Sequence, residues 1–313
     1  MDVLQIAGVH GIRQGSSATM LGLSSKWQKT VDSAVAASKH AEAVGPVALT
    51  VPSYREAYPK TATRHMRLGP GQIDDAPVDE DEEVFILEVL AAYAPSALAE
   101  EDASPLAGHT LGEARFTPRI LRRARAVDRV VGKGVTDRLL WLVREAHGYL
   151  RHEETGAAVR AEIRAALTAT GAPMVIAHSL GSVIFYDMLT RGEVPIRHTG
   201  APGVTTLITC GSPLSWLCVR KGVHTPGAPL SAPAGVEWTN LHSPNDIVNK
   251  GAGLSHLAVG VTDVVAHNGG VAKAHDVHRY LAKETVVELA LRARKRVRDA
   301  HSGSCPEQAP SAS

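Results

Sequence analysis

Short apolar runs alternate with longer stretches of helical periodicity along this chain. The short runs are rich in Val, Ile and Leu and are bounded by Gly, Pro or polar residues, as is typical of buried strands. They predict five strands, at residues 3–9, 47–51, 173–176, 204–209 and 236–241. Between the first two, Trp27, Val31 and Val35 recur at helical spacing and predict a helix over residues 18–43. Strands separated by helices predict an α/β fold with a central, mostly parallel sheet flanked by helices.

A long excursion over residues 54–135 separates the second predicted strand from the third. It contains an acidic run, then an apolar helix candidate over residues 84–92, then a basic helix candidate rich in Arg over residues 119–129. The basic segment fits a nucleic-acid or lipid contact, or a solvated helix face paired with the nearby acidic run, and the second interpretation is favoured. The apolar residues of the excursion either cover an apolar pocket or form ordinary core. Residues 136–168 predict one or two amphipathic helices that lead back to the sheet.

Composition limits the classes of partner. The chain has 313 residues and a formal net charge of +1, which gives no field that would attract nucleic acid or an anionic membrane surface. It shows no signal peptide and no stretch of ~20 apolar residues, so we expect no stable membrane insertion. Cys210, Cys218 and Cys305 fit no zinc spacing and indicate reduced thiols in a cytoplasmic protein. We expect one domain over residues 1–300 and a disordered tail at 301–313, and we make no prediction of oligomeric state.

Residues 175–182, VIAHSLGS, place a serine where a buried strand turns into a helix. In the pattern G-x-S-x-G the flanking positions are small, so that the chain turns sharply and presents the serine above the sheet as a nucleophile. Here Ala177 replaces the first glycine, His178 precedes Ser179, and Gly181 keeps the last position. An ordinary turn serine is the alternative that this pattern leaves open.

A nucleophilic serine needs a base and an orienting acid, expected in the chain order Ser, Asp, His. Asp246 lies in a turn just after the strand at 236–241, and either orients the base or caps that turn. Among the later histidines, His275 fits the base best because it directly precedes the last predicted helix, and His267 is the second choice. His278 would lie about one turn inside that helix.

Such a centre also needs two backbone N–H groups that stabilise the anion formed during the reaction, an arrangement called an oxyanion hole. One is expected from Leu180, the residue after the serine. The other is expected from the loop after the first strand, where we assign Ile12, with Gly11 as the fallback.

Two other chemistries fit the residues less well. The glycines at 8, 11 and 15 miss the G-x-G-x-x-G spacing of a dinucleotide loop. His275 and His278 with Asp263 and Asp276 lack a matched set of metal ligands elsewhere in the chain. We therefore predict no metal and no cofactor.

In their order along the chain, five segments resemble serine hydrolases of the α/β-hydrolase superfamily, of the lipase and esterase type: VHGIRQG, VIAHSLGSVIFYDML, LITCGSPLSW, WTNLHSPNDIVNKG and AHDVHRYL. The resemblance covers the sheet-forming parts and leaves residues 54–135 and the tail outside it. It implies the α/β-hydrolase fold with a helical cap or lid inserted over residues 54–135. It also implies cleavage of a small-molecule carboxylic ester by a Ser179–His275–Asp246 triad through an acyl-enzyme. An acyltransferase or a thioesterase would use the same residues; a peptidase and a non-catalytic binding protein on this fold are less favoured.

Overall fold

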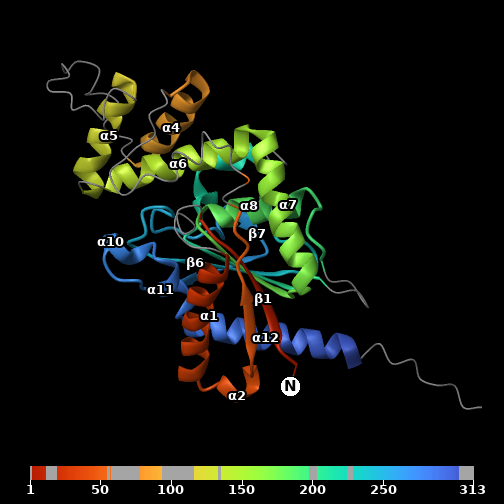
Figure 1. Ribbon diagram of the computed structural model, residues 1–313. Coiled ribbons are helices and arrows are strands. Elements are labelled where there is room, and N and C mark those ends of the chain that lie inside the picture. Colours follow the sequence, from red (N-terminus) through yellow and green to blue (C-terminus); the bar gives the residue numbers. More distant parts are fainter. Residues whose placement is uncertain are drawn as a thin grey trace, which may run out of the picture.

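The structure is a computed structural model that describes residues 2–11, 20–54, 57, 78–93, 116–132, 135–196, 203–223 and 228–302 (Figure 1). Its main sheet has six parallel strands in the order β2-β1-β3-β4-β6-β8. They are β1 (Leu4–Val9), β2 (Val47–Thr50), β3 (Met174–His178), β4 (Thr206–Cys210), β6 (Glu237–His242) and β8 (Val261–Val265). A short parallel pair, β5 (Leu230–Ser231) and β7 (Ala258–Val259), forms a second sheet.

Helices pack against both faces of the main sheet. One face carries α1 (Met20–Ala37), α2 (Ala41–Val44), α11 (Val277–Leu281) and α12 (Glu284–Ser302). The other carries α7 (Glu153–Thr170) and α8 (Leu180–Thr190). Side chains alternate along β3, so that Met174 and Ile176 join the first core while Val175 and Ala177 join the second. The predicted α/β class with a mostly parallel central sheet is confirmed.

Three further helices lie between β2 and β3 in the chain. They are α4 (Glu80–Tyr93), α5 (Pro118–Val131) and α6 (Val135–Arg151), which pack on one another (Figure 1). Through α4 and α6 the group also contacts α9 (Leu217–Gly222), which follows the short helix η5 (Pro213–Ser215).

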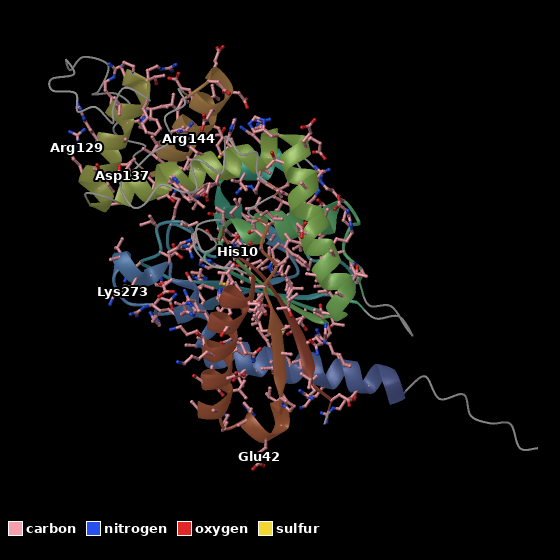
Figure 2. The ribbon with its side chains drawn as sticks, viewed as in Figure 1. His10, Glu42, Arg129, Asp137, Arg144 and Lys273 are labelled. Carbon is pink, nitrogen blue, oxygen red and sulfur yellow. The ribbon has the colours of Figure 1, made fainter. Side chains whose placement is uncertain are left out.

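The side chains of this group explain its charge pattern. Phe85 and Ile86 of α4 are buried in one core with α5 and α6, which favours the interpretation of that apolar segment as core. Arg144, labelled in Figure 2, donates from Nε to Glu82 Oε1 at 2.6 Å, and Arg119 lies 3.9 Å from Glu83. Glu83 of the acidic run thus lies beside Arg119 of the basic segment, whereas the partner of Glu82 comes from α6. Asp74 and Asp75, the first part of the acidic run, lie outside the described residues.

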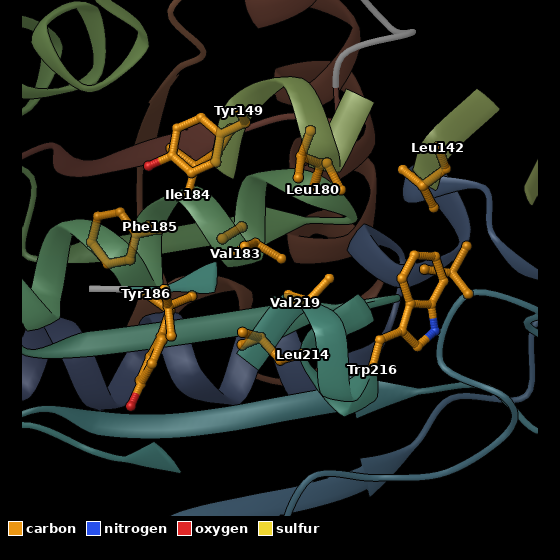
Figure 3. Close-up of a cluster of buried hydrophobic side chains, with 14 of the residues drawn as sticks. Leu142, Tyr149, Leu180, Val183, Ile184, Phe185, Tyr186, Leu214, Trp216 and Val219 are labelled. Atoms are coloured by element: carbon orange, nitrogen blue, oxygen red, sulfur yellow. The ribbon is translucent and has the colours of Figure 1, made fainter. Parts of the chain in front are cut away.

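Helix α8 begins directly after Ser179 and is buried along nearly its whole length. In Figure 3 the apolar side chains of Val183, Leu214 and Val219 gather between α8 and the segment that contains α9. At the far end of α8 the buried carboxylate of Asp187 accepts from the Tyr149 hydroxyl at 2.7 Å and from Arg191 Nε at 2.9 Å. Packing and hydrogen bonding thus hold the helix along its length.

Several elements differ from the prediction, beyond shifts of one or two residues at the ends of others. The helix expected over 18–43 is split, because Ser38 Oγ accepts from the His40 N–H in a turn between α1 and α2. Strand β8 was not predicted, since Thr262 and Asp263 interrupt its apolar run. Helix α12 continues to Ser302, two residues into the tail expected from 301, and residues 303–313 lie outside the described residues.

The structure bears on two expectations, those about membrane insertion and about the cysteines. Within the described ranges, no helix is both long and apolar enough to cross a membrane. Cys210 and Cys218 are buried free thiols, whereas Cys305 lies outside the described residues.

Candidate active site

The site lies where the path of the chain across the sheet changes direction. Strand β1 is flanked by β2 and β3, and the helices that follow β1 and β3 pack on opposite faces of the sheet. Loops that leave neighbouring parallel strands toward opposite faces open a crevice at the carboxyl ends of those strands. The segment after β1 brings Gly11 to this point, and the turn after β3 brings Ser179.

Ser179 occupies a strained backbone conformation. Its φ is 55° and its ψ −131°, a region that residues with a side chain rarely adopt and that costs on the order of 1–3 kcal/mol. The Ser179 N–H donates to the Cys210 carbonyl at 3.0 Å. Its own carbonyl accepts from the Ser182 N–H at 2.9 Å and from Ser182 Oγ at 2.6 Å. Hydrogen bonds on both sides therefore hold the sharp strand-to-helix turn that the sequence pattern predicts.

Two glycines let neighbouring backbone approach this turn. A Cβ on Gly11 would lie 2.9 Å from the Ser179 Cβ and 3.2 Å from its Oγ. A Cβ on Gly181 would overlap the carbonyl oxygen of Val9. The first strand thus packs closely against the serine turn only because both positions lack a side chain.

The structure brings Ser179, His275 and Asp246 into one hydrogen-bonded chain. His275 Nε2 lies 2.9 Å from Ser179 Oγ. His275 Nδ1 lies 2.9 Å and 3.0 Å from the two carboxylate oxygens of Asp246. A carboxylate only accepts, so Nδ1 carries the ring proton and Nε2 is left to accept the serine proton. His275 follows the short helix α10 (Val271–Ala274), and its side chain is 30% exposed while that of Asp246 is fully buried.

Asp246 is held as an anion in a buried position. Burial alone would raise its pKa, but the charge and hydrogen bond of His275 and hydrogen bonds from Tyr280 and Val248 outweigh burial and lower the pKa below its ordinary value. The Tyr280 hydroxyl donates to Oδ2 at 2.7 Å, and the Val248 N–H donates to Oδ1 at 2.9 Å. Asp246 therefore does both things that the sequence left open: it contacts His275, and it caps its own turn by accepting from the Val248 N–H.

Two other histidines near the serine are buried and neutral. His178 donates from Nε2 to the His275 carbonyl at 2.9 Å, and burial, followed by the nearby His275, lowers its pKa to about 3. His10, at the centre of Figure 2, donates from Nδ1 to the Gly11 carbonyl at 2.6 Å and stacks on the Tyr54 ring at 4.3 Å. Burial lowers the pKa of His10 to about 4. Both rings fix backbone beside the site, and neither competes with His275 for the serine proton.

Two of the three residues expected to supply the anion-stabilising N–H groups are among the described residues. Leu180 is the first residue of α8, so its N–H has no partner within the helix. Gly11 lies against Ser179, as its assignment as fallback donor requires. Ile12, the first choice for the second donor, lies outside the described residues.

The other candidate histidines and acids of the C-terminal segment are exposed or bonded to groups other than Ser179. His267 is exposed, and His278 pairs with Thr30 Oγ1 at 2.8 Å on α1. Asp276 caps α11 by accepting from the His278 N–H, while Asp263 accepts from the Leu254 and Ser255 N–H groups. Among the described residues, the group of His, Cys, Asp and Glu side chains close enough to share a metal ion is His40, Glu284 and Glu288, and both glutamates lie at the start of α12.

Sequence reasoning missed three contributors to the site. Tyr280 contacts Asp246 from α11, Ser182 supports the turn, and Gly211 lies beside the Asp246–His275 pair. Gly211 falls in the segment LITCGSPLSW, whose resemblance to α/β-hydrolases marked the region but not this residue. No spacing rule points from Tyr280 to Asp246, because the contact depends on how α11 packs.

The chain was also compared with known proteins. No family model, no curated protein and no solved structure matches it. The geometry of the site is therefore the basis on which a function is proposed.

Proposed function

We propose that the protein is a serine hydrolase of the α/β-hydrolase superfamily that cleaves a small-molecule carboxylic ester. The observation that carries the proposal is the hydrogen-bonded chain from Asp246 through His275 to Ser179, with Ser179 at a φ of 55°. The parallel sheet, the sharp turn after β3 and the order Ser, Asp, His along the chain fit that superfamily.

In the first half of the reaction, Ser179 Oγ attacks the ester carbonyl carbon while His275 Nε2 takes the hydroxyl proton. The carbonyl oxygen becomes an anion, which the Leu180 N–H and a donor from the segment after β1 stabilise. The carbon–oxygen bond to the alcohol then breaks, and His275 gives its proton to the departing alkoxide. Asp246 holds the ring orientation and stabilises the imidazolium during this exchange.

In the second half, water attacks the acyl-enzyme and gives a proton to His275. The tetrahedral anion collapses, the Ser179 ester bond breaks, and Ser179 Oγ regains a proton from His275 as the carboxylic acid leaves. Bonds and protons balance with water as the only co-reactant, so the proposed reaction requires no cofactor.

We further propose that α4, α5 and α6 form the cap of this site. The Tyr93 hydroxyl, at the end of α4, donates to the Ile247 carbonyl, directly after Asp246. Lys221 of α9 lies 3.3 Å from Glu88 of α4. These contacts support a helical group that rests on the loops at the carboxyl ends of the strands.

Reaction with a fluorophosphonate probe tests the proposed function. A serine activated by its histidine displaces fluoride and forms a stable phosphonate ester. We expect one adduct by intact mass, mapped by peptide analysis to Ser179, and none after heat denaturation because the hydrogen-bonded chain is then lost. Absence of an adduct on folded protein, or an adduct on another serine, would contradict the proposal.

Replacing Gly211 with alanine is expected to lower kcat/KM by about 10²-fold, the effect of misplacing catalytic groups by about 1 Å. A Cβ at this position would lie 2.9 Å from both Asp246 Oδ2 and His275 Nδ1, so the pair has to move. The φ of Gly211 is +56°, which adds about 1–2 kcal/mol of backbone strain for alanine. Ester hydrolysis and chemical unfolding measure the two effects separately.

Gly171→Ala is the matched control for this substitution. Gly171 ends α7 with a φ of +58°, and a Cβ there meets no atom within 4 Å. We expect a similar loss of unfolding free energy with unchanged kcat/KM. Equal loss of activity in the two variants would show that backbone strain alone, and not the position of the Asp246–His275 pair, explains the Gly211 result.

A further inference from the structure

Asp246 receives a hydrogen bond from a side chain outside the triad. The Tyr280 hydroxyl donates to Asp246 Oδ2 at 2.7 Å, a short distance typical of a bond to a charged acceptor. The Tyr280 ring is buried in the core between α11, α1 and the sheet, and Asn249 Nδ2 lies 3.5 Å from the hydroxyl oxygen. Because Asn249 can donate from this amide, the hydroxyl proton is left to point at Asp246.

We propose that Tyr280 is a positioning residue of the Ser179 centre, whose hydroxyl fixes the Asp246 carboxylate so that it holds the His275 ring toward Ser179. The inference rests on the proposed function. Asp246 Oδ1 has a donor in the Val248 N–H, and Oδ2 has one in Tyr280. With one fixed donor on each oxygen, the carboxylate plane cannot rotate away from His275 Nδ1, which contacts both oxygens.

Tyr280 is suited to this role because it stays a neutral donor. Burial raises the pKa of its hydroxyl, and the adjacent Asp246 charge raises it further. The other groups that face Asp246 are His275, His178, Cys210 and Tyr93. Burial lowers the pKa of His178 and raises that of Cys210 and of Tyr93, so these three are uncharged at neutral pH. The anion of Asp246 therefore depends on His275, Tyr280 and the Val248 N–H.

The test is Tyr280→Phe, which keeps the buried ring and removes only the hydroxyl. We expect kcat/KM to fall roughly 10- to 100-fold, the equivalent of one hydrogen bond to a charged group. Loss of a donor to the anion raises the pKa of Asp246. The more basic carboxylate also stabilises the adjacent imidazolium more strongly, so the acidic limb of the kcat/KM profile moves to higher pH. The same shift is read without turnover by NMR titration of the Asp246 carboxyl carbon in the Ser179→Ala background.

Tyr149→Phe is a closely matched control. The Tyr149 hydroxyl also donates to a buried carboxylate at 2.7 Å, but its acceptor is Asp187, at the far end of α8 from Ser179. A purely structural role for Tyr280 predicts the same behaviour in both variants, namely lower stability with an unmoved pH profile. A positioning role predicts a moved profile and a moved Asp246 titration for Tyr280→Phe alone.

Two further comparisons decide between the possible outcomes. In an Asp246→Asn background, Tyr280→Phe should change kcat/KM by less than about threefold, because its effect passes through the carboxylate. An unmoved Asp246 titration and acidic limb in Tyr280→Phe, with Ser179-dependent hydrolysis intact in the wild type, would overturn the inference. Absence of any Ser179-dependent hydrolysis would overturn the proposed function instead, while the NMR titration would still decide the role of Tyr280.

Discussion

Replacing Ser179 with alanine is expected to lower kcat for ester hydrolysis by on the order of 10⁶-fold. Alanine offers no oxygen for the acyl-enzyme, so only uncatalysed attack by water on a bound ester remains. Substrate binding and the anion-stabilising N–H groups are untouched, and a residual rate about 10³–10⁴ above that in water is expected from them. Initial rates with a chromogenic ester, at substrate concentrations above and below KM, measure the loss.

The backbone of Ser179 provides a control that separates chemistry from folding. Serine and alanine both pay the strain of a φ of 55°, whereas glycine adopts it freely. Ser179→Gly should therefore be as inactive as Ser179→Ala and yet have a larger free energy of unfolding, by about 1–2 kcal/mol. This combination is expected at a residue where strain is retained for function. Substantial activity in either variant would refute the assignment of Ser179 as nucleophile.

The arrangement of Ser179, His275 and Asp246 could be anticipated because it follows from local signals and chain order. Each residue sits just after a predicted strand or just before a predicted helix, and parallel strands bring such positions to one edge of a sheet. The contacts join residues 96 and 29 positions apart in sequence. The sequence left His267 open beside His275, and only the packed structure separates the exposed ring from the one that contacts the serine.

Contacts that depend on packing between elements were not predictable in this way. Tyr280 looks like an ordinary apolar-face residue of α11, and its contact with Asp246 requires the position of that helix on the sheet. Gly211 looks like any turn glycine until the Asp246–His275 pair is placed over it. A residue type indicates what a side chain can do, whereas the groups that it meets depend on tertiary structure.

The strands also divide into those with a local sequence signal and one that depends on tertiary contacts. Those of the sheet interior have buried residues at nearly every position, and short apolar runs predicted β1, β3 and β4. Strand β6, EWTNLH, is more polar in sequence although its four central residues are buried. Strand β8 lies at the edge, where Thr262 and Val265 are exposed, and its mixed pattern gave no signal. Strand β8 forms because it pairs with β6, and this pairing is a tertiary contact that the local sequence does not reveal.

Replacing His275 with alanine is expected to lower kcat by about as much as Ser179→Ala, while His267→Ala leaves most of the activity. Without His275, the Ser179 hydroxyl loses the acceptor of its proton, and the buried His178 ring does not replace it because that ring is committed to the His275 carbonyl. His267 is exposed, and it is its backbone carbonyl, not its ring, that accepts from Lys283 Nζ, at 2.9 Å. Steady-state rates of the two variants under identical conditions make the comparison.

The double variant Ser179→Ala/His275→Ala tests whether the two residues act as one catalytic unit. Two residues that act as one unit lose nearly all of their effect with the first substitution, so the double variant should be no slower than either single one. Independent contributions would instead multiply, giving a much larger loss. Multiplication of the losses would show that His275 does not act through Ser179. A larger loss in His267→Ala than in His275→Ala would make His267, and not His275, the base.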